Sequence, residues 1–166
     1  MQKTNFFPLL ILTFLLSGCW SGTTEYTGLR FSETSDSNIT FQEHTIPADC
    51  SAFSHLLMNS AMNSSGQDIA SSLHREAQDK GANLVLVGLA REMEDEELKF
   101  ARFDYYGPDY DYNFNKTWLG WKFGFDKWND AGNFVGLGTD NWGNNEISFE
   151  HTLLIQAVFL RCGEEH

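Results

Sequence analysis

Residues 67–90 read QDIASSLHREAQDKGANLVLVGLA, and this stretch decides the fold that the sequence predicts. Its first part repeats apolar residues at steps of three and four, which predicts an amphipathic helix over 67–80. The apolar positions are Ile69, Ala70, Leu73 and Ala77. Gly81 is the residue type that ends a helix, and the apolar run after Asn83 is typical of a buried strand. The stretch therefore predicts a helix that leads into a buried strand.

Shorter patterns on either side predict the remaining elements of the core. Alternation over 38–46 predicts a strand, and 98–103 is a further candidate strand. Residues 51–62 carry apolar side chains at helical spacing, which predicts a short helix or a structured loop. The apolar run over 147–161 predicts a long buried strand. We therefore expect an α+β fold, with one main helix packed on a small three- or four-stranded sheet.

A long insertion over about 104–145, before the last strand, is dense in aromatic residues, Gly, Asp and Asn. Aromatic rings supply rigid contact area and amides supply directed hydrogen bonds, so the insertion is the candidate binding surface. Its candidate residues are Tyr110, Tyr112, Trp118, Trp121 and Trp128. The alternative is that these rings form a satellite core beneath the insertion.

The chain begins with the features of a secretory signal. Lys3 precedes an almost wholly apolar run over 6–16, and the small residues Ser17 and Gly18 follow it. The run is shorter than the stretch of about 20 residues that a membrane-spanning helix needs. We therefore expect residues 1–18 to be removed as a signal peptide.

The segment Leu16-Ser17-Gly18-Cys19 resembles the lipobox of bacterial lipoproteins. The resemblance implies that Cys19 receives a diacylglyceryl group, becomes the first residue of the mature chain and is acylated, for example with palmitate. Trp20 stands where an Asp signals inner-membrane retention, so the resemblance implies an outer-membrane lipoprotein, on the periplasmic or the surface face. Polar composition predicts a flexible tether over 19–37, ahead of a single domain over 38–166. The alternative is an ordinary secreted protein in which Cys19 is a spare thiol.

Lipidation of Cys19 would leave Cys50 and Cys162 as one pair. Export places that pair in an oxidising compartment, which favours a disulfide. Two buried thiols or a metal pair are the alternatives, although the spacing lacks the CxxC pattern of metal sites.

The charge balance disfavours several kinds of partner. The chain carries 11 Lys and Arg against 23 Asp and Glu, a net charge of −12, and loss of Lys3 with the signal makes it one unit more negative. Nucleic acid and anionic lipid both need a basic surface, so we expect no nucleic-acid partner and no electrostatic membrane binding.

The stretch Leu73–Gly88 resembles a signature of a group of small bacterial envelope domains. Cys50 before it, and the predicted last strand that runs into Cys162, add to the resemblance. The group includes the stress-sensing lipoprotein of the Rcs envelope pathway, its relatives and the YbjQ-like proteins. This sequence carries one cysteine pair where the Rcs sensor has two disulfides, and it adds the aromatic insertion. The resemblance implies a small α+β domain in an envelope protein.

The catalytic motifs of common enzymes do not occur in the sequence. GxSxG, HExxH, a phosphate loop and CxxC are all missing, and the five His residues are scattered. We expect no catalytic site, no metal and no cofactor. The expected function is a non-enzymatic envelope lipoprotein that acts through an envelope protein partner, in envelope maintenance or stress sensing. The alternative is a carbohydrate- or peptidoglycan-binding lipoprotein that uses the aromatic insertion.

Overall fold

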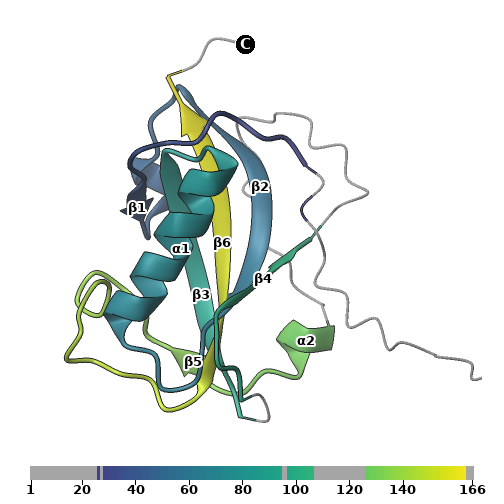
Figure 1. The fold of residues 1–166 in the computed structure, drawn as a ribbon, viewed down its shortest axis with the longest axis vertical. Coiled ribbons are helices and arrows are strands. Elements are labelled where there is room, and N and C mark those ends of the chain that lie inside the picture. The colour runs from purple at the N-terminus through teal and green to yellow at the C-terminus, as the bar shows by residue number, and fades with distance from the viewer. Residues whose placement is uncertain (1–25, 27, 95–96, 107–125, 164–166) are drawn as a thin grey trace, which may run out of the picture.

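The computed structural model describes residues 26, 28–94, 97–106 and 126–163 (Figure 1). The strands are β1 (Asn38–Thr40), β2 (Cys50–Asn59), β3 (Leu84–Met93), β4 (Arg102–Tyr105), β5 (Phe134–Val135) and β6 (Thr152–Cys162). The helices are α1 (Gly66–Lys80), α2 (Asp126–Asn129) and a 3-10 turn at Glu43–Thr45. None of the helices in these residues is long and apolar enough to cross a membrane.

The fold is dominated by its sheet, so the expected α+β arrangement on a small sheet is wrong. The described strands form one six-stranded mixed sheet in the order β1-β3-β6-β2-β4, with β5 also paired to β3 (Figure 1). β1 runs parallel to β3, and the other pairs are antiparallel. Only α1 is a helix of substantial length. The described part of the insertion adds β5 to the sheet and packs α2 against it.

The error in the fold class arises at 51–62, which forms β2 and not a helix or loop. All ten residues of β2 are buried, because β2 lies between β6 and β4 and both faces of the sheet are covered. A strand covered on both faces carries apolar residues without alternation, and its side chains can match helical spacing by chance. The spacing of the apolar residues over 51–62 therefore does not distinguish a helix from a strand that is buried on both faces.

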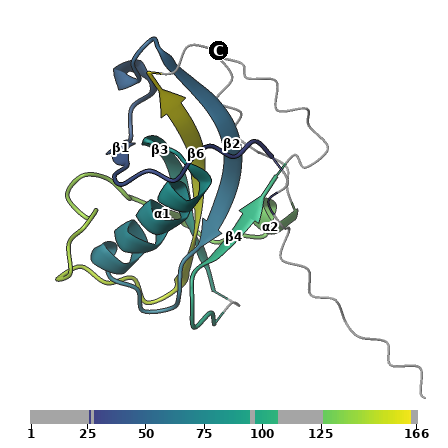
Figure 2. The ribbon, with the colours of Figure 1, turned by 45° about the horizontal axis from the view of Figure 1, so that its top comes forward.

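The helix predicted over 67–80 is confirmed as α1, which lies across one face of the sheet (Figure 2). Ser65 caps it with a capping box, in which Asp68 N donates to Ser65 Oγ and Ser65 N donates to Asp68 Oδ2. Gly81 ends it at φ 83°, in the left-handed region that glycine adopts without strain. The buried face of the helix packs on apolar side chains of β2, β3 and β6, including Phe53, Met58, Val85, Ile155 and Phe159.

Cys50 and Cys162 stand directly opposite each other at the paired ends of β2 and β6. Their sulfur atoms are joined in a disulfide, with the Cα atoms 3.9 Å apart. The bond closes a long loop, since 112 positions separate the two residues.

Residues 28–37, expected as part of a flexible tether, pack against the domain as an extended arm. Phe31 N donates to Lys80 O and Thr34 N to Gln78 O, so the arm closes over the C-terminal turn of α1. The Phe31 ring meets Phe53 edge-on at 4.9 Å between centroids. The folded unit therefore begins ahead of Asn38.

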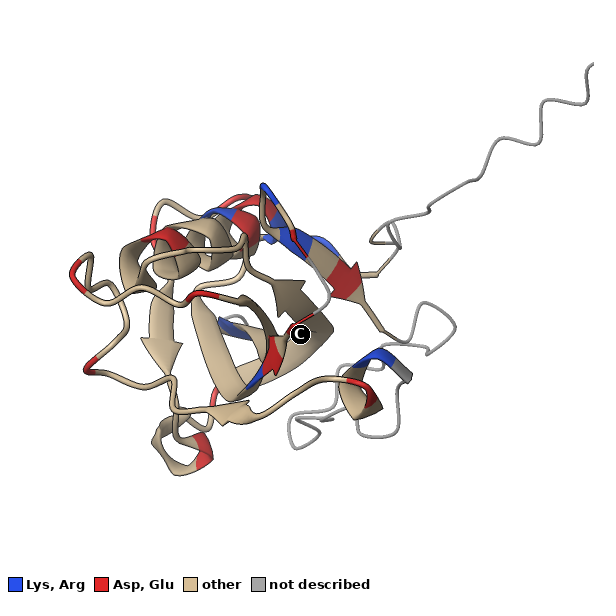
Figure 3. Ribbon diagram, turned by 90° about the horizontal axis from the view of Figure 1, so that it is seen from below, with Lys and Arg blue, Asp and Glu red and all other residues tan. Residues whose placement is uncertain are grey.

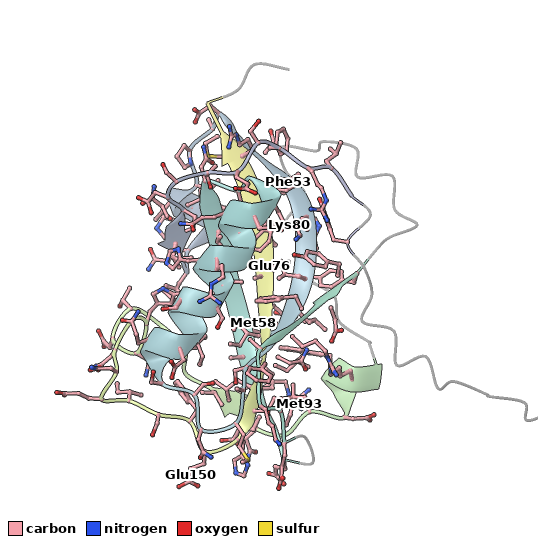
Figure 4. The ribbon with its side chains drawn as sticks, in the orientation of Figure 1. Phe53, Met58, Glu76, Lys80, Met93 and Glu150 are labelled. Carbon is pink, nitrogen blue, oxygen red and sulfur yellow. A yellow bond between two sulfur atoms is a disulfide. The ribbon has the colours of Figure 1, made fainter. Side chains whose placement is uncertain are left out.

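Tyr26, at the start of the described arm, is buried against the opposite side of the molecule from β1. Its ring lies 4.6 Å from that of Tyr105 in β4. Glu76 and Lys80 project from α1 toward the same place (Figure 4), where Tyr105 donates to Glu76 Oε1 at 2.6 Å. Burial, and secondarily the charge of Glu76, raises the pKa of Tyr105 far above its ordinary value.

Candidate functional site

The expected aromatic surface does not form an open site where the structure describes it. Trp128 is only 4% exposed, so its assignment to a binding surface is wrong. Its ring belongs to a buried cluster with Leu57, Tyr106 and Leu154 on the sheet face opposite α1. The other four candidates, Tyr110, Tyr112, Trp118 and Trp121, lie outside the described residues.

Arg91 of β3 fixes the α2 segment on this face. The guanidinium donates to the carbonyl oxygens of Trp128, Ala131 and Gly132. It also lies over the Trp128 ring, 5.6 Å from the centroid. Because carbonyl groups at the end of a short helix need partners, this arginine completes their hydrogen bonding. The α2 segment closes this part of the sheet instead of opening a binding site.

Ser37 and His74 are the residue types of a catalytic nucleophile and its base, and their side chains are in contact. Ser37 Oγ lies 2.7 Å from His74 Nδ1, the spacing of a nucleophile and its base. Ser37 is only 2% exposed, however, and no Asp or Glu among the described residues hydrogen-bonds to His74. The contact fastens the arm to α1, since Ser37 ends the arm and His74 lies in the helix.

A loop over 136–149 folds back onto the start of α1 and presents Trp142 beside β1. Three backbone bonds hold it there: Gly66 N to Ile147 O at 3.0 Å, Gln67 N to Asn144 O at 3.1 Å and Gly143 N to Gly66 O at 3.2 Å. Trp142 N also donates to Gly138 O at 2.9 Å, which closes a turn within the loop. The position of the ring is therefore set by the first turn of the helix.

The Trp142 ring packs between the helix and the chain that follows β1. It meets Phe41 edge-on at 5.6 Å between centroids and His74 at 6.3 Å. Its Nε1 atom is buried and has no hydrogen-bond partner among the described residues. The three rings hold the loop, β1 and α1 in one arrangement.

Beside these rings lies a hollow of about 350 Å³, which we call the β1 groove. It is lined by Ile39, Thr40, Phe41, Gln42, Thr139 and Trp142. Its base is aromatic and aliphatic, and its rim is polar. This mixture of an apolar floor with a few polar groups is typical of binding sites.

Two further hollows continue the β1 groove along the edge of the sheet. The upper one, of about 440 Å³, shares Ile39 and Thr40 and reaches Cys162. The lower one, of about 250 Å³, shares Phe41 and reaches Leu89 and Leu137. It lies where the pairing of β3 with β6 is interrupted by a bulge, and Leu89 N donates there to Gln156 Oε1 at 3.3 Å. Bulges are common next to functional sites because they redirect side chains.

Phe41 and Trp142 are not among the candidate residues that the sequence predicts. Phe41 falls in the strand predicted over 38–46, and Trp142 lies in the insertion. The turn-forming run Asp140–Asn145, DNWGNN, was the one local signal that a loop displays this tryptophan. Nothing local indicates that the loop returns to α1.

Comparison with known proteins finds no match to a family model, to a curated protein or to a solved structure.

Proposed function

We propose that this chain is a non-enzymatic, lipid-anchored protein of the bacterial envelope that acts through contacts with another protein at the β1 groove. The observation that carries the proposal is the position of the groove relative to the start of the arm. Tyr26 contacts β4, at one edge of the sheet, and the groove follows β1, at the other edge.

The anchor in this proposal is the lipid on Cys19 of the lipobox-like segment. Only residues 20–25 separate Cys19 from the buried Tyr26. An extended chain spans at most about 3.6 Å per residue, so Tyr26 would lie within about 25 Å of the membrane surface. The β4 edge of the domain would then face the bilayer.

The groove would face away from the membrane in that orientation. Four strand spacings of about 4.8 Å separate β4 from β1, so the groove lies about 19 Å farther from the anchor across the sheet. A membrane-held protein that acts on a partner in the surrounding space needs its contact surface in that position. Roles in envelope maintenance or stress sensing are both compatible with it.

Carbohydrate or peptidoglycan binding is the second candidate, because Trp142 and Phe41 could serve as stacking rings. The polar groups of the rim favour protein instead. Thr40 Oγ1 is engaged locally, with Gln42 O at 3.2 Å and Thr45 Oγ1 at 2.6 Å. Glycan recognition needs directed hydrogen bonds to many hydroxyl groups, and this rim offers fewer of them.

Site-specific photo-crosslinking in living cells tests the proposal. A photoreactive amino acid at Gln42, on the groove rim, is expected to give a discrete protein adduct. The same amino acid at Arg75, an exposed position on α1, serves as the control and is expected to give none. Equal adducts from both positions, or none from Gln42, would refute a protein contact at the groove.

The anchor is tested separately by intact mass of the membrane-extracted protein. A mass equal to a chain that starts at triacylated Cys19 supports the anchor, and an unacylated chain overturns it. A Cys19→Ala variant is the control and is expected to leave the membrane fraction.

A further inference from the structure

The segments that build the β1 groove contain acidic residues and no basic ones. The stretches that line the three hollows, 38–47, 83–89 and 137–142, contain the acids Glu43 and Asp140 and no Lys or Arg. The three hollows have no basic residue in their lining, and Glu43 lines the lower one. The outer loops at the left of Figure 3 are coloured red at several points and blue at none.

The acids on the loop of the groove are available to a partner. Asp140 follows Thr139 of the groove lining, and both Asp140 and Glu146 are exposed. Neither forms an ion pair with a described residue. By contrast, Lys80 pairs with Glu76 at 3.1 Å and Lys127 pairs with Asp104 at 3.0 Å, so several cations are already neutralised elsewhere.

The shape of the site suits an extended chain. The hollows follow one another along β1, which is three residues long and pairs, among the described strands, only with β3. An edge strand can accept an added extended segment, which is a common mode of peptide recognition. The rings of Phe41 and Trp142 lie at the centre of the row.

We propose that the β1 groove binds an extended segment of a partner protein that carries Lys or Arg side chains between apolar ones. This inference rests on the proposed function and adds the chemistry of the partner. The apolar stems of the basic side chains would pack on the aromatic rings, and their charged heads would reach Glu43 and Asp140. A second copy of this chain is a poor occupant, because it would bring the same acidic face.

Fluorescence polarisation of labelled eight-residue peptides with the detergent-solubilised full chain tests this chemistry. The probes alternate Val with Arg, Gln or Glu. Only the Arg-Val peptide is expected to bind, and raising the salt concentration from 50 to 300 mM should weaken its binding severalfold. Equal binding of the Gln-Val peptide, or binding that is insensitive to salt, would overturn the charge selection.

Three variants locate the binding. D140N combined with E43Q should weaken the Arg-Val peptide about three- to tenfold, as expected for two exposed charge pairs. T139R, which places a cation on the exposed rim, should weaken it at least as much without disturbing the fold. E97Q removes an exposed acid outside the groove and should leave binding unchanged. Unchanged binding in T139R, or equal weakening in E97Q, would overturn the location.

The two proposals fail in different ways. If no peptide binds but Gln42 still gives its adduct in cells, a protein docks at the groove and the basic segment is refuted. If the Arg-Val peptide binds at the groove but Gln42 gives no adduct, the groove chemistry stands and the cellular protein contact is refuted.

Discussion

Replacing Gly66 with alanine should move the loop that forms one wall of the β1 groove. A Cβ atom at position 66 would lie 1.8 Å from Asn141 O and 2.9 Å from Asn144 O. Both obstacles are backbone atoms, which cannot rotate away as a flexible side chain would. The Asn141 carbonyl must therefore move by more than 1 Å before the contact reaches 3.0 Å.

The expected cost follows from the bonds that such a movement breaks. Three backbone hydrogen bonds join 66–67 to the loop, and each contributes about 1 kcal/mol net. Alanine recovers up to about 1 kcal/mol through its better helix propensity. We expect G66A to lower the free energy of unfolding by about 2 kcal/mol, which for a domain of this size lowers Tm by roughly 4–8 °C. Without the clash, the same substitution would be neutral or stabilising.

Urea unfolding followed by circular dichroism measures this free energy. Hydrogen exchange at the amides of Gln67 and Gly143 reports whether the loop has separated from the helix. Gly136→Ala is the matched control, because a Cβ atom there meets nothing within 4 Å. If G66A is as stable as the wild type, or if G136A loses as much, the close approach of loop and helix is not the cause.

Three further perturbations test other parts of the fold. Asp68→Asn should cost about 0.3–1 kcal/mol at neutral pH, because it removes a negative charge from the first turn of α1. Because the Ser65 hydrogen bonds lower the pKa of Asp68, the wild-type advantage in urea unfolding should fade from about pH 4 downward. The wild type should lose stability above about pH 10, because the raised pKa keeps Tyr105 protonated in the folded chain while the unfolded chain releases the proton. Tyr105→Phe should abolish this loss, and urea unfolding at alkaline pH measures the free energy of unfolding of both proteins. Cys50→Ser with Cys162→Ser opens the 112-residue closure and should cost up to about 5 kcal/mol by urea unfolding, with wild type under reductant as the comparison.

Local signals were sufficient for α1 and the strand after it. The capping residues Ser65 and Gly81 and the apolar spacing between them specify a helix without reference to the rest of the chain. The apolar run over Leu84–Val87 is buried as its composition predicts. The formation of α1 and of the first part of β3 depends mainly on residues that are close in the sequence, so both could be predicted from it.

The sheet was underestimated because its strands depend on distant partners. β2 is an interior strand because β4 pairs on one side of it and β6, about a hundred residues later, pairs along its length on the other. β5 has two residues and exists only through its pairing with Ala90 and Arg91. A segment so short carries no periodicity of its own, and no sequence pattern could have placed it.

The candidate site was missed for the same reason. Phe41, His74 and Trp142 come from three separate parts of the chain, and only the folded structure brings their rings together. Trp128 was misplaced because exposure cannot be inferred from residue type, since aromatic-rich insertions can pack as readily as they can bind.

The arm connects the β4 edge, where the proposed anchor segment meets the domain, with the β1 groove, where the proposed partner binds. It starts at Tyr26 beside β4, crosses the C-terminal turn of α1 through Phe31 and reaches β1, where Ser37 contacts His74. His74 in turn packs on Trp142 of the groove. The segment next to the proposed lipid anchor is therefore connected by continuous packing to the ring at the centre of the groove. Because the arm is bonded to α1 and not free, the fold itself sets the edge of the sheet at which the proposed anchor segment meets the domain.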